Sequence, residues 1–406
     1  MKKILIFSLA YYPKYVGGAE VAIKEITDRI SPDEIQFDMI TLRFDSSLSR
    51  VEQIGNVTVY RIGLTKNNPS MEELLQFPMY LVKVLYPPIA ALKAYQLHRV
   101  NKYDGGWAMM SYMGFPLILM RYFLFTNIPY VLTLQEGDTV EHVFKRWRIR
   151  MVGLLYGPVY RSASAVQTIS TFLANWARNM GYQGPLEVVP NAVDTRKFSV
   201  DFPEAELNEL KIKLGKKDGD VFVITTSRLV TKNAVDIVIQ SLKFLPDDVH
   251  FLVLGIGPDE AMLKKLAEDE GVASRVKFLG QVDHEEMPKY LKVSDIFTRP
   301  SRSEGMGNSF VEAMAARIPV VATAVGGITD FLFDPVANPD KEPTGLFATV
   351  ADPKDTARAI RQYIDDVELR KRCVDNAYAM VMESYDWNLI AKDMQDKVFR
   401  TLLSGE

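Results

Sequence analysis

The sequence has few of the residues that form covalent or metal cross-links. Its 406 residues include a single cysteine, Cys373, and only four histidines. One thiol can form neither an internal disulfide nor a cysteine metal cluster, so we expect a reducing compartment, the cytoplasm. The histidines are scattered along the chain: His98, His142, His250 and His284. Their spacing argues against chemistry that needs two histidines side by side.

Long hydrophobic runs are also absent. No uninterrupted stretch of about 18 apolar residues occurs, so the sequence predicts no membrane span. The N-terminus, MKKILIFSLAYYPKYVGGAE, resembles a signal peptide only in part, because its apolar run of about six residues ends in Tyr-Tyr-Pro without a small-residue cleavage site. We interpret it as a buried first strand. A hydrophobic content of 48%, a charged content of 24% and a net charge of −3 are typical of a globular protein that does not bind nucleic acid.

Acidic residues are scarce in parts of the first half. Residues 1–195 hold 20 Lys and Arg against 16 Asp and Glu, whereas the remainder holds 28 against 35. Only Asp104 is acidic between residues 74 and 135, and no acidic residue occurs in 142–186. The basic, apolar stretch KRWRIRMVGLLY (145–156), together with part of 74–95, predicts a face that lies on anionic lipid. The alternative is an ordinary hydrophobic core edged with solvated arginines.

Short apolar runs alternate with helix-like segments along the chain. The runs are rich in apolar, β-branched and aromatic residues. Those of the first half are KILIFSL, FDMITL, VTVYRI, GGWAMM, PYVLTL and ASAVQTI, and those of the second are VFVITTS, VHFLVLG, RVKFLG, DIFTRPS and PVVATAV. This order predicts the α/β class, with two Rossmann-like, doubly wound parallel sheets. The length also fits two domains, which we place at 1–195 and 196–385. Residues 386–406 predict a final amphipathic helix that is apolar at Trp387, Ile390, Met394, Val398 and Leu402.

Turns that follow strands are the candidate binding sites, because ligands of such sheets bind at the carboxyl ends of the strands. Gly17 and Gly18 open a helix after the first strand, where free backbone N–H groups can approach a phosphate. Arg228 and Lys232 follow the first strand of the second domain, where two cations could grip a diphosphate. Taken alone, a plain turn and a pair of solvated surface charges explain these residues equally well.

The stretch SRSEGMGNSFVEAMAA (301–316) places two carboxylates around a Gly-Met-Gly turn. Glu304 precedes this turn, and Glu312 follows it on a face of the helix that the turn opens. A carboxylate that accepts two vicinal hydroxyls is a usual way to hold a ribose, although surface helix charges are the alternative. The polar loop TLQEGD, which contains Gln135, ends a strand of the first domain.

One glycine-rich turn argues against a nucleotide-dependent dehydrogenase. GIGPDE (255–260) has only the first two glycines of the dinucleotide pattern, and Pro258 occupies a position that the pattern does not favour. A nicotinamide cofactor is therefore not expected.

The motifs together resemble those of the GT-B retaining glycosyltransferases of family 4, the glycogen-synthase-like group 1 transferases. The resemblance covers essentially the whole chain. It is carried by SEGMGNSFVEAMAARIPVVATAVGGITD, with its Glu-x7-Glu element and Gly-Gly turn, and by VVPNAVDTRKF, SRLVTK and GGAE. It implies a GT-B fold, a donor cleft between two domains and a C-terminal helix that returns to the first domain.

The resemblance also implies roles for individual residues. Glu312 would bind the donor ribose, Glu304 would face the donor sugar, and Val282 would contact the base through its backbone. Arg228 and Lys232 would stabilise the diphosphate in place of a metal ion, with no cofactor. The backbone amides of Met306, Gly307 and Asn308, with that of Gly18, would hold the diphosphate and sugar, and Gly17 and Gly305 would belong to the same donor-binding turns.

The implied enzyme is a retaining, metal-independent hexosyltransferase of cell-envelope or polysaccharide biosynthesis. UDP is the favoured nucleotide and GDP the second choice, and the acceptor is a lipid-linked species or a glycan. The enzyme would be cytoplasmic, with peripheral contact to the inner face of the membrane.

Two positions depart from the family pattern. Gln135 stands where many members have histidine, and a neutral amide cannot transfer a proton at neutral pH. The spacing from Arg228 to Lys232 is one residue shorter than in many relatives, which puts Asn233 at the commoner lysine position. Retaining transfer in this fold is usually described without a protein base, with the acceptor's proton passing to the departing phosphate, so glutamine is compatible with it.

Other interpretations stay open. A GT-B epimerase or phosphorylase shares the architecture, but an epimerase needs acid/base groups aimed at the sugar, and we expect only His142 near a candidate loop. A phosphorylase needs a lysine for pyridoxal phosphate, of which the sequence gives no sign. The third alternative is a non-catalytic sugar-nucleotide-binding protein that lost activity with the histidine. Donor hydrolysis or transfer distinguishes it from an enzyme.

Overall fold

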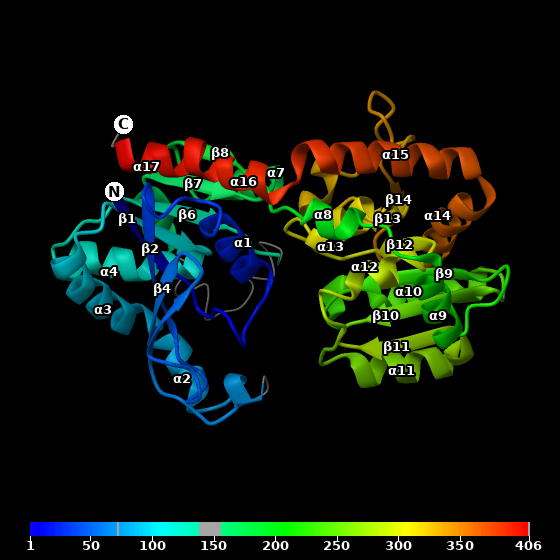
Figure 1. Cartoon of the computed structure of the whole chain (residues 1–406), viewed down its shortest axis with the longest axis horizontal. Coiled ribbons are helices and arrows are strands. Elements are labelled where there is room, and N and C mark those ends of the chain that lie inside the picture. The colour runs from blue at the N-terminus through cyan, green and yellow to red at the C-terminus, as the bar shows by residue number, and fades with distance from the viewer. Residues whose placement is uncertain (71–72, 138–155, 405–406) are drawn as a thin grey trace. The chain divides into compact units, whose positions relative to one another are not determined.

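The computed structural model describes residues 1–70, 73–137 and 156–404. His142 and all of the basic stretch 145–156 except Tyr156 lie outside these residues. The chain divides into two units, and it passes between them twice (Figure 1). Unit 1 comprises Met1–Asn191 and Trp387–Glu406, and unit 2 comprises Ala192–Asp386.

Unit 1 is built on an eight-stranded sheet with the order β3-β4-β2-β1-β5-β6-β7-β8. Its strands are β1 Lys2–Phe7, β2 Ile35–Leu42, β3 Val51–Ile54, β4 Val57–Ile62, β5 Gly105–Met109, β6 Tyr130–Leu134, β7 Ala165–Thr168 and β8 Leu186–Val188. All neighbours pair in parallel except β3 and β4, which form an antiparallel hairpin. Residues 4–7 of the central strand β1 are fully buried, as expected of a parallel sheet covered on both faces.

The helices of unit 1 cover this sheet (Figure 1). They are α1 Gly18–Thr27, α2 Met79–Val84, α3 Tyr86–Asn101, α4 Phe115–Phe123, α7 Thr171–Asn179, α16 Trp387–Asp393 and α17 Arg400–Ser404, with short 3-10 turns at Glu73–Leu75 and Ser111–Gly114. Phe399 packs against Trp107 and Phe37, with ring centroids 5.1 and 5.9 Å apart. The C-terminal segment therefore contributes to the core of unit 1.

The predicted C-terminal helix differs from the observed one in one detail. A π-helical segment, η7 Met394–Phe399, separates α16 from α17, so the helix is not uniformly α. The five apolar residues that the sequence pattern selected, Trp387, Ile390, Met394, Val398 and Leu402, are nevertheless all buried. The apolar periodicity predicted the buried face correctly, because a single wider turn leaves most of that face in line.

Unit 2 has a six-stranded sheet in which every pair is parallel, with the order β11-β10-β9-β12-β13-β14. Its strands are β9 Val221–Thr226, β10 Val249–Leu254, β11 Val276–Gly280, β12 Ile296–Arg299, β13 Val320–Thr323 and β14 Leu346–Ala348. The chain runs from β9 to one side of the sheet and then returns to the other side through β12. The switch point between β9 and β12 is where such sheets bind ligands.

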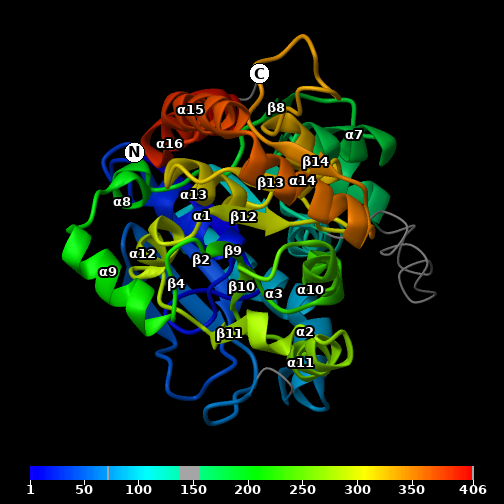
Figure 2. The ribbon, with the colours of Figure 1, turned by 90° about the vertical axis from the view of Figure 1, so that its right-hand side faces the viewer.

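The helices of unit 2 are α8 Thr195–Ser199, α9 Glu204–Lys213, α10 Val235–Ser241, α11 Glu260–Asp269, α12 Met287–Lys292, α13 Asn308–Ala315, α14 Pro353–Asp365 and α15 Val367–Ser384. Figure 2 faces this unit and shows α8, α12 and α13 grouped together. The single cysteine, Cys373, lies fully buried in the core between α15 and the sheet.

Candidate donor-binding site

Two loops of unit 2 leave the switch point side by side. The first, residues 227–234, follows β9 and carries Arg228 and Lys232, and we call it the cationic loop. The second follows β12 and carries Glu304. We call residues 300–308 the carboxylate loop. The sequence placed these residues at the carboxyl ends of two strands but could not show that the two strands are neighbours.

A buried arginine holds Glu304 in place. Arg299, the last residue of β12, is buried and donates from Nη2 to Glu304 Oε2 at 2.6 Å. It also donates from Nη1 to Ser309 Oγ at 2.8 Å, and its guanidinium lies 4.3 Å from the centre of the Phe310 ring. Glu304 Oε1 accepts from the amide of Gly305 at 3.0 Å. Both carboxylate oxygens of Glu304 are therefore fixed by the protein.

The charge of Arg299 depends on its carboxylate partners. Burial lowers the pKa of Arg299 from its ordinary value, while the nearby charges of Glu304 and Glu312 raise it. Burying an ion is costly unless a counter-ion compensates it, and here Glu304 is the direct counter-ion. The carboxylate loop is thus built over an ion pair that is almost out of water.

Two glycines allow the carboxylate loop to take its shape. Gly307, the residue before α13, has a φ of +90°, and a Cβ atom there would lie 2.6 Å from both Arg299 and Phe310. Gly326, with a φ of +55°, lies against the backbone of Glu304, because a Cβ atom there would lie 1.7 Å from Glu304 O. Only glycine fits at these positions, which accounts for the second glycine of the Gly-Met-Gly turn and the first of the Gly-Gly turn.

Glu312 is bound by a histidine. The Nε2 atom of His284 lies 3.1 Å from Glu312 Oε1, and Nδ1 of the same ring lies 3.1 Å from Lys197 Nζ. A lysine ammonium only donates, so in the neutral ring Nδ1 accepts and Nε2 carries the proton given to Glu312. The expectation that only His142 lies near a candidate loop is wrong, because His284 contacts a predicted site residue directly.

Arg302 ties the two loops together. Its backbone N–H donates to Lys232 O at 2.7 Å, and its guanidinium binds both oxygens of Asp236 at 2.9 and 2.6 Å. The hydrogen bonds with Asp236 raise the pKa of Arg302. This bidentate pair holds the cationic loop against the carboxylate loop, since a fork of two parallel hydrogen bonds fixes both distance and orientation.

Lys232 and Asn233, the two positions at which the family's phosphate-binding lysine could stand, have different surroundings in the cationic loop. Asn233 is buried and donates from Nδ2 to Arg228 O at 2.7 Å, so its side chain supports the backbone of the loop. Arg228 is exposed and Lys232 is half-buried. Gly255 of the GIGPDE turn lies against this loop, because a Cβ atom there would be 1.9 Å from Ser227 O. Close backbone packing therefore explains that glycine without a dinucleotide site.

The other sequence-predicted residues lie at separate places. Val282 is half-buried in the turn between β11 and α12, two residues before His284. In unit 1, the amide of Gly17 donates to Glu20 Oε2 at 2.8 Å, and a Cβ atom added at Gly18 would meet nothing within 4 Å. Gln135 forms a reciprocal amide pair with Asn191, with both bonds at 3.2 Å.

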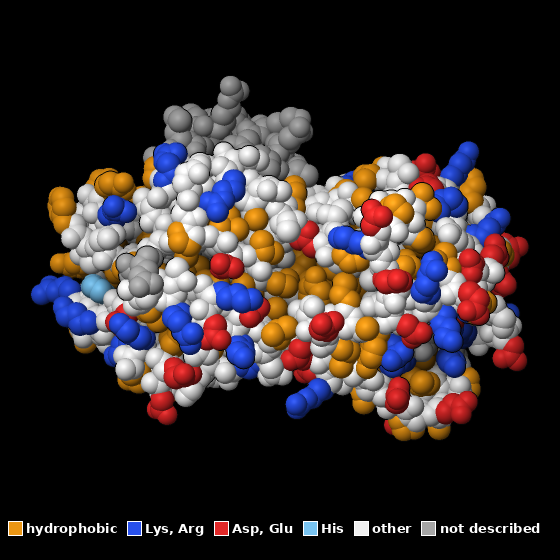
Figure 3. Space-filling model, turned by 90° about the horizontal axis from the view of Figure 1, so that it is seen from above, with side chains coloured by type: hydrophobic (Ala, Val, Ile, Leu, Met, Phe, Trp, Pro, Cys, Tyr) orange, Lys and Arg blue, Asp and Glu red, His pale blue; other side chains and the backbone are white. Residues whose placement is uncertain are grey.

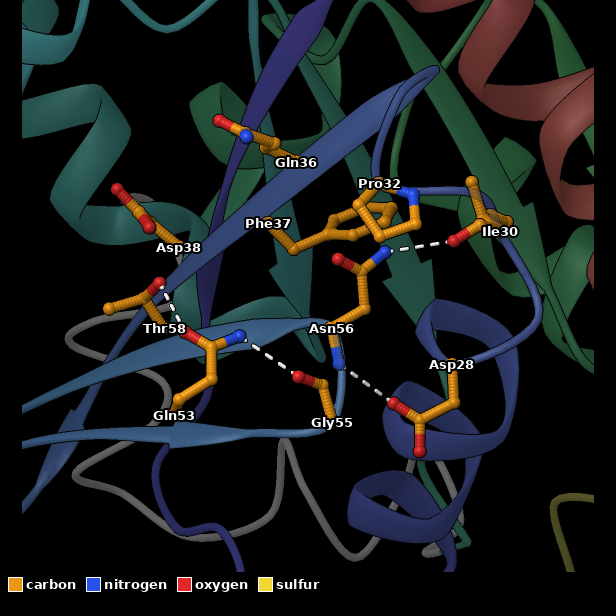
Figure 4. A pocket seen from close by; sticks show the side chains of 10 residues that line it. All are labelled: Asp28, Ile30, Pro32, Gln36, Phe37, Asp38, Gln53, Gly55, Asn56 and Thr58. Carbon is orange, nitrogen blue, oxygen red and sulfur yellow. Dashed lines mark hydrogen bonds between the residues drawn. The ribbon is translucent and has the colours of Figure 1, made fainter.

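A polar pocket of about 530 Å³ lies elsewhere in unit 1 (Figure 4). It lies beside the amino ends of β2 and β4, opposite to the edge where the ligand loops of a parallel sheet emerge. Asn56 Nδ2 donates to the carbonyl of Ile30, the amide of Asn56 donates to Asp28, and Gln53 bonds Gly55 and Thr58. These groups satisfy one another's hydrogen-bonding capacity, so we interpret the pocket as part of the structural framework of unit 1.

Sequence reasoning missed three residues of the site: Arg299, His284 and Lys197. Arg299 belongs to the predicted strand DIFTRPS, and a cation at the end of a buried strand is itself a sign that a buried acidic or polar group pairs with it. Nothing in the sequence marks the contact of His284 with Glu312, 28 residues away.

The family models of known proteins match both units. Residues 207–380 match the model described as glycosyl transferases group 1, and residues 17–192 match the glycosyl transferase 4-like domain. An uncharacterized glycosyltransferase of Methanocaldococcus jannaschii is 22% identical in an alignment of 406 positions that covers 96% of each chain. A GDP-mannose-dependent alpha-(1-6)-phosphatidylinositol monomannoside mannosyltransferase of Mycobacterium tuberculosis is 34% identical over 175 residues, 39% of this chain and 44% of the relative.

Solved structures show the same fold. Sucrose-phosphate synthase from Thermosynechococcus elongatus superposes with a TM-score of 0.82 at 19% identity over 100% of both chains. The HepE protein of Anabaena, solved in complex with UDP-glucose, gives a TM-score of 0.75 at 20% identity over 98% of this chain and 100% of that one. The two parallel sheets are therefore those of the GT-B fold. The chain belongs to the group 1 glycosyltransferases of family 4, and it is a nucleotide-sugar-dependent glycosyltransferase.

Proposed function

We propose that this chain transfers a hexose, with retention of anomeric configuration and without a metal ion, from a nucleoside-diphosphate sugar to a lipid-linked or glycan acceptor of cell-envelope or polysaccharide biosynthesis. Enzymes of its family are generally retaining. The observation that supports this proposal most directly is that the cationic loop and the carboxylate loop lie side by side at the β9/β12 switch point and are connected by the hydrogen bonds of Arg302.

Each end of the donor has a proposed partner in unit 2. Glu312 binds the ribose hydroxyls, and Glu304 faces the hydroxyls of the transferred sugar. The diphosphate lies between Arg228, Lys232 and the amides of Met306, Gly307 and Asn308. The buried side chain of Asn233 supports the choice of Lys232, because Asn233 is already hydrogen-bonded to its own loop. Val282 remains the proposed backbone contact for the base.

The proposed reaction exchanges one bond at the anomeric carbon for another. The bond from this carbon to the donor phosphate oxygen breaks, and a bond to the acceptor oxygen forms on the same face. The proton of the acceptor hydroxyl passes to the departing phosphate, so no protein base is needed. The protein contributes cations and backbone dipoles that stabilise the charge of the leaving diphosphate. Gly17, Gly18 and Gln135 of unit 1 remain predictions from the family resemblance.

The nucleotide is proposed to be UDP, with GDP as the second candidate. A structure of the same fold was solved with UDP-glucose, which supports UDP, whereas the relative at 34% identity is GDP-mannose-dependent. A thermal-shift screen with UDP, GDP, ADP and their sugars tests the choice, since a ligand that binds the folded state raises its apparent stability. If GDP-mannose alone stabilised the chain, the proposed nucleotide would be GDP and not UDP.

Replacement of Glu312 tests the site itself. Glu312→Ala removes charge-assisted hydrogen bonds worth about 1.5–3 kcal/mol, so donor binding measured by calorimetry should weaken roughly 10- to 150-fold. Glu304→Gln, which keeps the side-chain shape, should lower turnover as well. Glu268→Ala is the matched control, because Glu268 is an exposed carboxylate on α11 of the same unit. Parental binding and turnover in both site variants would show that the donor binds elsewhere.

A further inference from the structure

Helices α2 and α3 of unit 1 expose an apolar stripe. Only Leu85 separates the two helices: its amide donates to Leu81 O at 2.8 Å, and its carbonyl accepts from the amide of Ile89 at 3.3 Å. The helical spacing therefore continues through the junction and keeps residues three or four apart on one face. The α2–α3 stripe consists of Leu81, Val84, Leu85, Ile89 and Leu92, whose exposed fractions range from 37% to 55%.

The opposite face of the same helices is also apolar. Met79, Val82, Tyr86 and Ala90 are buried, and the Tyr86 hydroxyl donates to Ile40 O of the sheet at 2.8 Å. This inner face already anchors the helices to unit 1, so the stripe is not needed for folding. A helix that is apolar on both faces is normally covered on both, and a contiguous exposed apolar surface marks an interaction site.

The charges carried by α2 and α3 are of one sign. No Asp or Glu occurs between Glu73 and Asp104, whereas Lys83, Lys93, Arg99 and Lys102 do. The Lys83 and Lys93 ammonium groups lie 5.5 and 5.2 Å from the centres of the rings of Phe44 and Tyr60, so their stems run along apolar surface. Arg99 is exposed seven residues beyond Leu92, on the same helical face. The two helices themselves thus carry cations and no acidic side chain, and the acidic residue that precedes them, Glu73, is paired with Lys66.

We infer that the α2–α3 stripe docks on the surface of an anionic lipid bilayer. Apolar side chains enter the boundary between headgroups and acyl chains, and the flanking cations bind the anionic headgroups. A second copy of the chain is a poorer partner, because a two-fold contact would bring the cations of α2 and α3 against one another, with no acidic side chain on these helices to offset them. The face seen in Figure 3, by contrast, carries acidic and basic side chains intermixed, so it offers anionic lipid no comparable surface of one sign. Among the described residues no helix can span a membrane, so the contact is peripheral.

Sedimentation of the full chain with lipid vesicles tests the inference. The probes are vesicles of phosphatidylcholine alone and of phosphatidylcholine with about one-third phosphatidylglycerol. The test variant is Leu81→Gln/Leu85→Gln/Leu92→Gln, since glutamine preserves helix propensity. The matched control is Ile212→Gln/Met262→Gln/Met382→Gln, which replaces three exposed apolar side chains on helices of unit 2.

Parent and control should bind the anionic vesicles, with binding that falls as salt is raised, and the stripe variant should bind at least tenfold more weakly. Circular dichroism should show that the stripe variant is folded. Failure of the parent to bind anionic vesicles, or equal binding by the stripe variant, would overturn the inference. A concentration-dependent dimer that only the stripe variant abolishes would also overturn it, in favour of a second copy. Donor binding needs no vesicle, so loss of the proposed function leaves this result independent.

Discussion

Replacement of Arg299 by methionine should destabilise unit 2 more than any change at the surface of the site. The guanidinium is buried, bonds Glu304 and Ser309, and lies on the Phe310 ring. Methionine fills a similar volume but leaves the carboxylate of Glu304, which is only 14% exposed, without its counter-ion. Removing one partner of a buried ion pair costs about 3–5 kcal/mol, and the slight exposure of Glu304 favours the lower end, about 3 kcal/mol.

Double substitution separates the ion pair from simple loss of packing. Arg299→Met/Glu304→Gln removes both charges, so it should recover much of the stability that Arg299→Met loses, with a coupling of at least about 1.5 kcal/mol. Ser309→Ala is the control for the second hydrogen bond, and it should cost about 1 kcal/mol.

Urea denaturation can assign the effect to the correct unit. All four tryptophans belong to unit 1, because none of the chain's Trp residues lies within Ala192–Asp386. Far-UV circular dichroism reports on both units, whereas tryptophan fluorescence reports on unit 1. We expect the Arg299 variants to shift the circular dichroism transition and to weaken donor binding. A cost below about 1 kcal/mol in Arg299→Met, or a double variant no more stable than the single one, would contradict the role of the ion pair.

Three further predictions concern the same unit. Gly219→Ala and Gly307→Ala both place alanine at a φ of +90°, which costs about 1–2 kcal/mol, but only Gly307→Ala should also abolish donor binding, since its Cβ atom would displace Arg299; equal effects would rule out the steric argument. Activity should survive EDTA, because Arg228 and Lys232 replace a metal ion in the proposed mechanism; loss that Mg²⁺ restores would refute this. Burial raises the pKa of Cys373 to about 11, so the folded chain should resist alkylation at pH 8 and lose stability between pH 9 and 11, as ionisation of the thiol favours the unfolded state. Fast alkylation of the native chain would show that the thiol is accessible.

The sequence predicts those parts of the fold that rest on strong apolar patterns. VTVYRI coincides with β4 residue for residue, and the five apolar positions of the C-terminal segment are all buried. The missed strands, β3, β8 and β14, are only three or four residues long, and β3 and β8 carry partly or fully exposed side chains at the sheet edges. Edge strands form because a neighbouring strand offers hydrogen bonds, which a local pattern does not record.

The candidate site likewise has a part that the sequence predicts and a part that it does not. The rule that ligands bind beyond the carboxyl ends of strands was enough to select Arg228, Glu304 and Glu312. The contacts of Arg299 and His284 depend on where two loops converge in space, and a single sequence holds no such distances.

The two carboxylates of the site are held differently, and this difference fits their proposed roles. Glu304 is fixed by a buried arginine and by the amide of Gly305, so its position is set before any donor arrives. Glu312 is held by His284, whose side chain is 56% exposed, through one bond that water can replace. A group that faces the reacting sugar gains from rigid placement, because misplacement there raises the barrier directly. A group that binds the ribose need only recognise hydroxyls, so a weaker restraint on Glu312 is sufficient.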